Sequence, residues 1–179
     1  MYQIAGDVYL FRGGIRLVRV SAHMGTYLYT SAMDNRNRLF VASCMSLVVT
    51  AMSFAVRGGI MGDLEASFSL DKEQLGWIAG AAFFGFTISM MLGGPLCDVV
   101  GMKKLAWAAF WGHLLGMVLT IFAGGFATLY AGTLLIGIGC GFVEAACNPL
   151  VATLYPDEKT KKLNQFHVWF PGGLWSVRW

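Results

Sequence analysis

Long stretches without a charged side chain constrain this sequence more than any other feature. Residues 39–56, 74–97 and 105–143 are uncharged over 18, 24 and 39 positions. As an α-helix, the shortest stretch covers roughly 27 Å, close to the thickness of the hydrocarbon core of a bilayer. The longest stretch exceeds a single crossing, and the Gly124-Gly125 pair inside it signals a turn.

The sequence therefore predicts an all-α membrane protein with four membrane-spanning helices. The spans are expected near residues 39–60, 75–97, 105–124 and 127–154. The composition agrees, because 56% of the residues are hydrophobic and only 13% are charged, about half the usual share in soluble domains. A soluble fold would need a polar exterior that this composition does not supply.

Residues 1–38 differ from the rest of the chain, because they mix polar and apolar side chains and contain no long apolar run. Five arginines lie there: Arg12, Arg16, Arg19, Arg36 and Arg38. A signal peptide is not expected, since there is neither a compact apolar core nor a small-residue cleavage site. Two readings stay open. Residues 8–20 could form a surface helix, although Gly13-Gly14 weakens it, or the native chain starts at Met33 and this polar, basic segment is not native.

Several classes of function are disfavoured. The net charge of +3 and the short basic clusters argue against a nucleic-acid-binding protein. The four cysteines lie in apolar segments and no pair has metal-ligand spacing, so we expect buried thiols, no disulfide framework, no metal and no cofactor. They are Cys44, Cys97, Cys140 and Cys147. An enzyme is not expected, because the spans hold neither a serine–histidine pairing nor a second carboxylate.

The loop charges predict an orientation. Cations gather on one side of the expected spans, and acidic side chains on the other. The first side holds Arg36, Arg38, Lys103, Lys104, Lys159, Lys161 and Lys162; the second holds Asp63, Glu65, Asp71 and Glu73, with Lys72 as its cation. The positive-inside rule then places the N-terminus in the cytoplasm, and we expect an integral protein of a bacterial-type inner membrane.

Small residues recur at four-residue spacing within the spans. Such spacing lets membrane helices approach closely, since packing drives their association. The series are Gly76 and Gly80; Gly85, Ser89 and Gly93; Gly112 and Gly116; and Gly137, Gly141 and Ala145. They predict a closely packed bundle and say nothing of function.

A short segment after the second span combines turn residues with charges. Gly94 is followed four residues later by Asp98, then by Gly101 and the basic pair Lys103-Lys104. Gly101 suits a tight turn, and Asp98 can accept hydrogen bonds from backbone amides at a nearby helix N-terminus. The basic pair is expected to anchor the cytoplasmic face.

This segment resembles the signature loop between the second and third helices of the major facilitator superfamily. In that family a basic residue often follows the aspartate directly, whereas this chain has Val99. The resemblance implies the N-terminal portion of a major facilitator bundle, with four helices and the start of a fifth. It also implies a structural or gating role for the loop residues.

Glu144 is the only carboxylate within the expected spans and lies near the middle of its own. A charged side chain there costs at least about 2.5–3.5 kcal/mol on insertion scales. Burial therefore favours the protonated carboxyl, which suits a group that loads and releases a proton. Asn148 follows four residues later on the same helical face, Gly137 and Gly141 leave room there, and Pro149 frees a backbone carbonyl. The alternative is that Glu144 only bonds a neighbouring helix and holds the bundle together.

The Asn148-Pro149 pair, the Leu163-Asn164 pair and the later Phe170-Pro171-Gly172-Gly173 segment resemble the fucose/glucose/galactose permease branch of the superfamily. The resemblance implies a proton-coupled symporter of a monosaccharide. Glu144 is then the proton-coupling candidate, and Asn148, Asn164 and His167 are substrate-path candidates. For His167, a cytoplasm-facing histidine at a helix start is the alternative. Which sugar is carried, and whether the driving ion is a proton or sodium, stays open.

Arg57 departs from that branch, which often has an aspartate in its first helix. Helical rise separates Arg57 from Glu144 by roughly 12 Å in depth, so direct pairing is not expected. We expect the Arg57 side chain to reach the outer surface along its helix.

The resemblance covers residues 39–173 and leaves an aberrant tail at 174–179. The chain is therefore expected to be a truncated fragment of a transporter, unable to transport alone, because such transporters build the substrate path between two six-helix halves. The alternative is a four-helix membrane scaffold or assembly subunit without transport activity. The loop at 94–104 and the polar stripe at Glu144 favour the first reading.

Overall fold

A computed structural model describes residues 2–4, 7–10 and 18–177, with side chains from Asn35 onward. The chain divides into two compact units, Met1–Val41 and Ala42–Trp179. The second unit holds most of the first candidate membrane span and all of the other three.

The first unit contains a small antiparallel sheet and the start of a long helix. Strands β1 (Tyr2–Ile4), β2 (Asp7–Leu10) and β3 (Val18–Ser21) pair in the order β1-β2-β3. The surface helix considered for residues 8–20 is therefore not present at 8–10 or 18–20, and residues 11–17 lie outside the described residues. Alternating apolar and polar residues, such as Val18-Arg19-Val20, suit a strand better than a helix.

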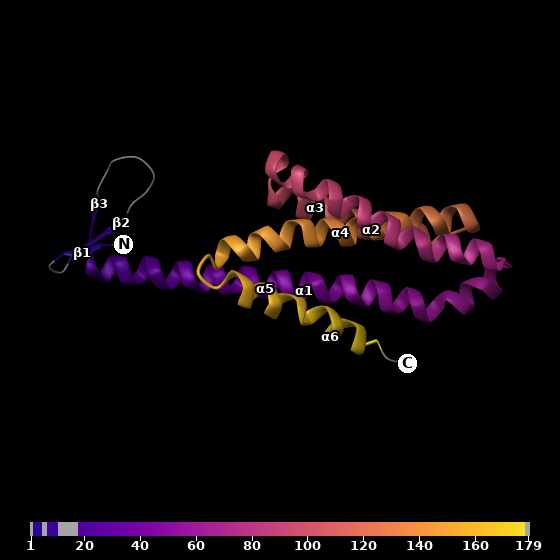
Figure 1. Cartoon of the computed structure of the whole chain (residues 1–179), viewed down its shortest axis with the longest axis horizontal. Helices are drawn as coiled ribbons and strands as arrows, with labels where there is room; N and C mark the ends of the chain where they lie inside the picture. Colours follow the sequence, from indigo (N-terminus) through magenta and orange to yellow (C-terminus); the bar gives the residue numbers. More distant parts are fainter. Residues whose placement is uncertain (1, 5–6, 11–17, 178–179) are drawn as a thin grey trace. The chain divides into compact units, whose positions relative to one another are not determined.

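Among the described residues six helices follow, and four of them are long and apolar enough to cross a membrane. They are α1 (Ala22–Phe68), α2 (Lys72–Val100), α3 (Met102–Ile121), α4 (Phe126–Leu154), α5 (Lys159–His167) and α6 (Trp169–Trp175). The candidate spans are the Asn35–Phe68 part of α1 and the whole of α2, α3 and α4. Figure 1 shows these helices in chain order. The predicted all-α membrane architecture is confirmed for this part of the chain.

The helices extend beyond the apolar stretches. α1 continues to Phe68 rather than ending near residue 60, because polar residues such as Asp63 lengthen a helix into the interface without breaking it. α3 ends at Ile121, so the Gly124-Gly125 pair lies in the connection to α4. The fifth helix is broken at Val168 into α5 and α6.

Two tight connections fix the ends of α2. Before it, Asp71 forms a capping box: its carboxylate accepts from the Gln74 amide at 2.7 Å, and the Gln74 side chain accepts from the Asp71 amide at 3.1 Å. After it, the connection is Gly101 alone, with φ +87, a conformation that favours glycine. Gly94 and Asp98 belong to α2, so the expected loop at 94–104 is almost entirely helical.

α4 packs closely against both α2 and α3, because its glycines bring the backbones together. A methyl group at Gly137 would overlap the carbonyl oxygen of Ala82 in α2. On the other side, a methyl group at Gly139 would lie 3.0 Å from the carbonyl oxygen of Ala109 in α3. The glycines of one helix thus admit two neighbours, as expected for membrane helices.

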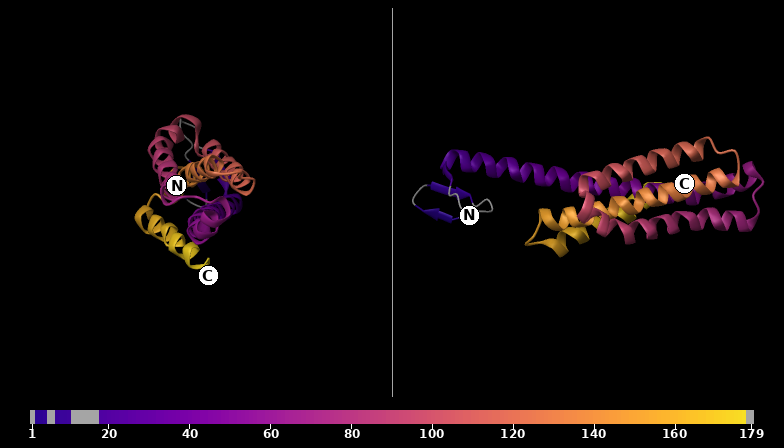
Figure 2. Two further views of the ribbon diagram at one scale, coloured as in Figure 1. Left: turned by 90° about the vertical axis from the view of Figure 1, so that its right-hand side faces the viewer. Right: turned by 90° about the horizontal axis from the view of Figure 1, so that it is seen from above.

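The last two helices return along α1 (Figures 1 and 2). A methyl group at Gly173 of α6 would lie 3.0 Å from the carbonyl oxygen of Val48 in α1. The ring of Phe54 in α1 lies 6.4 Å from that of Phe170 in α6 and 5.5 Å from that of Phe83 in α2. Phe54 therefore links three helices.

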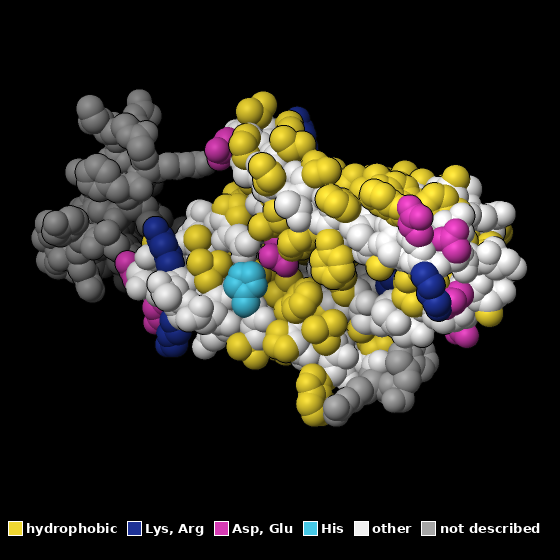
Figure 3. Space-filling model, turned by 45° about the vertical axis from the view of Figure 1, so that its right-hand side comes forward, with side chains coloured by type: hydrophobic (Ala, Val, Ile, Leu, Met, Phe, Trp, Pro, Cys, Tyr) yellow, Lys and Arg dark blue, Asp and Glu magenta, His cyan; other side chains and the backbone are white. Residues whose placement is uncertain are grey.

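The bundle exterior is apolar over most of its length. Large side chains on α2 and α3 are more than half exposed, including Phe83 at 64%, Met91 at 74% and Ile121 at 74%. Figure 3 shows hydrophobic side chains over much of one face, with charged side chains mainly toward its ends. Such a surface is stable in lipid and not in water.

Replacing Gly137 by alanine is expected to destabilise the bundle by roughly 1–3 kcal/mol, because the added methyl group overlaps the α2 backbone. The measurement is unfolding in mixed micelles, followed by helical circular dichroism. Gly76→Ala is the matched control, since a methyl group there meets no atom within 4 Å. An equal loss of stability in both variants would contradict the close α2–α4 contact.

Candidate membrane-embedded site

Glu144 lies on α4, half-buried and one turn from the helix centre at Cys140. His167 at the end of α5 lies within electrostatic reach of its carboxylate, although the two form no ion pair. α5 packs against α4, which brings these two sequence-predicted residues to the same region. The arrangement places one acid and one histidine together at the α4–α5 contact.

Asn148 lies on α4 next to α2. It lines a cavity of about 330 Å³ with Gly94, Asp98 and Pro149, and neither Glu144 nor His167 lines that cavity. The Asn148 side-chain oxygen is buried and has no hydrogen-bond partner. A buried acceptor without a partner is costly, so this oxygen is available to a donor that enters the cavity.

The remaining sequence-predicted residues are exposed. Asn164 lies in the middle of α5, and Lys103 and Lys104 occupy the first turn of α3. Asp98 is exposed and accepts no hydrogen bond from the described residues, so the amide contacts expected for it are not formed here. Asn164 is not among the residues that line the cavity of Asn148.

The expectation that Arg57 reaches the outer surface is wrong. Its side chain is half-buried, and its guanidinium lies within electrostatic reach of Cys140 and His113. Cys140 is the central residue of α4 and His113 is near the centre of α3, so the guanidinium points into the bundle. Arginine has a long side chain, so the depth of its backbone along the helix does not fix the direction in which the side chain points.

His113 and Cys140 form a polar contact between α3 and α4. His113 Nδ1 lies 3.1 Å from the Ala109 carbonyl, which can only accept, so Nδ1 holds the proton in this geometry. His113 Nε2 lies 3.3 Å from Cys140 Sγ and accepts from the thiol. Both ring nitrogens therefore have partners.

Sequence reasoning missed this contact. His113 is the one histidine in the expected spans. Because a polar side chain within a membrane is rarely placed without a partner, its position indicated that it contacts another polar group. Its partner is 27 residues away on another helix, and only the rotation of both helices reveals it.

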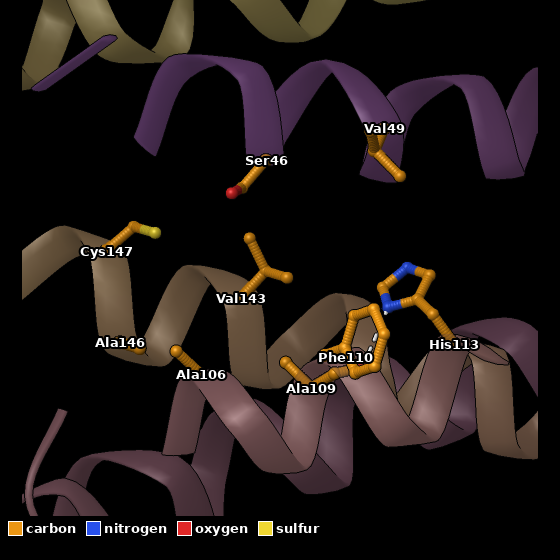
Figure 4. Close-up of a pocket in the computed structure, with 9 residues that line it drawn as sticks. All are labelled: Ser46, Val49, Ala106, Ala109, Phe110, His113, Val143, Ala146 and Cys147. Atoms are coloured by element: carbon orange, nitrogen blue, oxygen red, sulfur yellow. Dashed lines mark hydrogen bonds between the residues drawn. The ribbon is translucent and has the colours of Figure 1, made fainter. Parts of the chain in front are cut away.

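A cavity of about 250 Å³ opens beside His113 between α1, α3 and α4. Figure 4 shows Ser46 and Val49 on α1, Val143 and Cys147 on α4, and His113 on α3. A second cavity of about 420 Å³ shares Val49 and includes Arg57. No group of three metal-ligating side chains occurs among the described residues.

These features define a polytopic helical membrane protein with ionisable side chains inside its bundle. Such side chains are rare in membranes and mark ion or substrate paths. The sequence matches the Major Facilitator Superfamily over residues 43–168, and the chain belongs to this family. The resemblance seen in the loop at Gly94–Lys104 is thus confirmed at the level of the superfamily.

Two relatives give the family context. The chain is 28% identical to the 3-(3-hydroxy-phenyl)propionate transporter of Escherichia coli strain K12 over 112 residues, 62% of this chain and 28% of the relative. It is 24% identical to the MFS-type transporter ppz2 of Metarhizium majus strain ARSEF 297 over 139 residues, 78% of this chain and 23% of the relative. The chain thus spans about a quarter of either relative's length. No solved structure matches it.

The contact between His113 and Cys140 is expected to stabilise the bundle by roughly 0.6 kcal/mol, the average for side-chain hydrogen bonds between membrane helices. The measurement is a double-mutant cycle of His113→Ala and Cys140→Ala, with unfolding followed in mixed micelles. Additive effects of the two substitutions would mean that no such hydrogen bond forms.

Proposed function

We propose that this chain supplies the first four membrane-spanning helices of a secondary active transporter that moves a small molecule together with a proton. The observation that carries the proposal is Glu144, a carboxylate near the middle of α4, half-buried, with His167 in electrostatic reach. Membership of the family and the transporter names of both relatives support the coarse function.

The position of Glu144 suits a proton carrier. A permanently charged carboxylate inside the bundle costs several kcal/mol, and taking up a proton removes that cost. The exposed His167 lies within electrostatic reach of the carboxylate, so the charge at the α4–α5 contact changes when Glu144 takes up or releases a proton. A carboxyl group that can take up and release a proton is what coupling to a proton gradient requires.

For the transported molecule, the resemblance to the fucose/glucose/galactose permease branch favours a monosaccharide. Asn148 supports this candidate, because its buried oxygen without a partner can accept a hydrogen bond from a sugar hydroxyl. Asn164 and His167 are the other proposed substrate-path residues. The second candidate is an organic acid, favoured by the printed substrate of the Escherichia coli relative and by the cation Arg57 inside the bundle.

The proposed location is a bacterial-type inner membrane with the N-terminus in the cytoplasm. The turn between α2 and α3 carries Lys103 and Lys104, and α5 begins with Lys159. At the opposite end, the turn between α1 and α2 carries Asp71, and Lys72 there pairs with Glu65. The excess of lysine and arginine at one end supports this orientation.

Glu144→Gln tests the proton carrier. In the purified chain in lipid nanodiscs, the infrared band of a carboxylic acid in an apolar environment is expected to change as the pH is stepped from acid to alkaline. The Glu144→Gln variant is expected to lose that change. Glu158→Gln is the matched control, because the Glu158 side chain is 52% exposed and pairs with Lys161 at the surface. A band that persists in Glu144→Gln would contradict the assignment.

Transport itself is expected to need more of the protein than this chain. In liposomes, the chain alone should not accumulate labelled fucose, glucose or galactose under an inward proton gradient, because the path in this family lies between two helical halves. Accumulation above that of empty liposomes would overturn this expectation.

A further inference from the structure

Arg57 and the cavity beside it have no role in the proton path proposed above. Within the expected spans, Arg57 is the only charged side chain besides Glu144. It forms no ion pair with the described residues, and its electrostatic neighbours are Cys140 and His113, neither of which is acidic. A cation placed inside a membrane bundle is normally paired or faces a cavity where a charged ligand passes.

The cavity next to Arg57 has the size of a small-molecule site. It is an open cavity of about 420 Å³ between α1, α3 and α4, a volume within the usual range for ligand pockets. Its walls are mainly aliphatic and include Val56, Met117 and Ile136. Such walls suit the apolar body of a ligand rather than a ring of hydroxyl groups.

The polar groups in these walls are already engaged, apart from Arg57. The Ser53 hydroxyl donates to the Val49 carbonyl at 2.8 Å, and the Thr120 hydroxyl donates to the Gly116 carbonyl at 2.9 Å. Among the described lining residues, the free donors are therefore those of the Arg57 guanidinium. A sugar would leave several hydroxyls without partners here, at a cost of about 1–3 kcal/mol each.

We propose that Arg57 and this cavity form a binding site for an organic carboxylate with an apolar body. The guanidinium fork matches a carboxylate with two parallel hydrogen bonds, and the anion offsets the charge of the buried cation. This inference rests on the proposed transport function and selects the organic acid from its two candidate substrates. His113 is not a ligand, because both of its ring nitrogens have partners.

The test uses the full chain in phosphatidylcholine nanodiscs with labelled 3-phenylpropionate as the probe. The neutral 3-phenylpropanamide, which has the same body, is the competitor. The carboxylate is expected to bind, and Arg57→Gln is expected to weaken its binding roughly tenfold or more, with a smaller loss in Arg57→Lys because charge is kept and the fork is lost. Lys159→Gln, which removes an exposed cation outside the cavity, should leave binding unchanged.

Met117→Trp provides a second variant in case Arg57→Gln fails to fold. It keeps Arg57, fills the cavity and is expected to abolish probe binding while circular dichroism remains helical. Equal binding of the amide and the carboxylate, or unchanged binding in both variants, would overturn the proposal. A third outcome would also overturn it: the chain binds labelled phosphatidic acid in an Arg57-dependent manner but does not bind the probe. The cavity would then be a lipid-binding site.

The two proposals fail separately. A carboxylic-acid band that does not change with pH in the unsubstituted chain, or that still changes in Glu144→Gln, would contradict the proton carrier alone if probe binding is intact. A normal Glu144 response without probe binding would contradict the carboxylate site alone.

Discussion

The close approach of α4 to α2 and α3 is the constraint on which the rest of the bundle depends. Glycine on both sides of α4 lets its backbone touch two neighbours at once, with Gly137 against Ala82 and Gly139 against Ala109. In lipid there is no hydrophobic drive to join helices, so this packing supplies the attraction between them. It also fixes the rotation of α4, and hence the directions of its polar side chains.

That fixed rotation distributes three polar groups of α4 to three different neighbours. Glu144 lies near α5, Asn148 lines a cavity with α2, and the Cys140 thiol donates to His113 Nε2 of α3. One helix thereby supplies both the proposed proton carrier and part of the wall around Arg57. The two proposed sites differ in chemistry, since one is acidic and the other basic, and α4 contributes to both: it carries Glu144, and its Ile136 lines the cavity beside Arg57.

The sequence predicted what depends on length and periodicity and missed what depends on side-chain direction. The uncharged stretches predicted four spans, and the spacing of the glycines predicted a tightly packed bundle. The expectation for Arg57 was wrong because depth along a helix says little about where a long side chain turns. The His113–Cys140 contact could not be predicted, because it joins residues from two helices whose relative rotation appears only in the fold.

The single-residue connection at Gly101 has a mechanical consequence. α2 ends at Val100 and α3 begins at Met102, so a hinge of one residue joins the two helices and holds their ends close together. They can change the angle between them, but their joined ends cannot separate or slide past each other. Any displacement of α2 along the membrane normal would therefore drag the start of α3, and with it Lys103 and Lys104, through the headgroup layer.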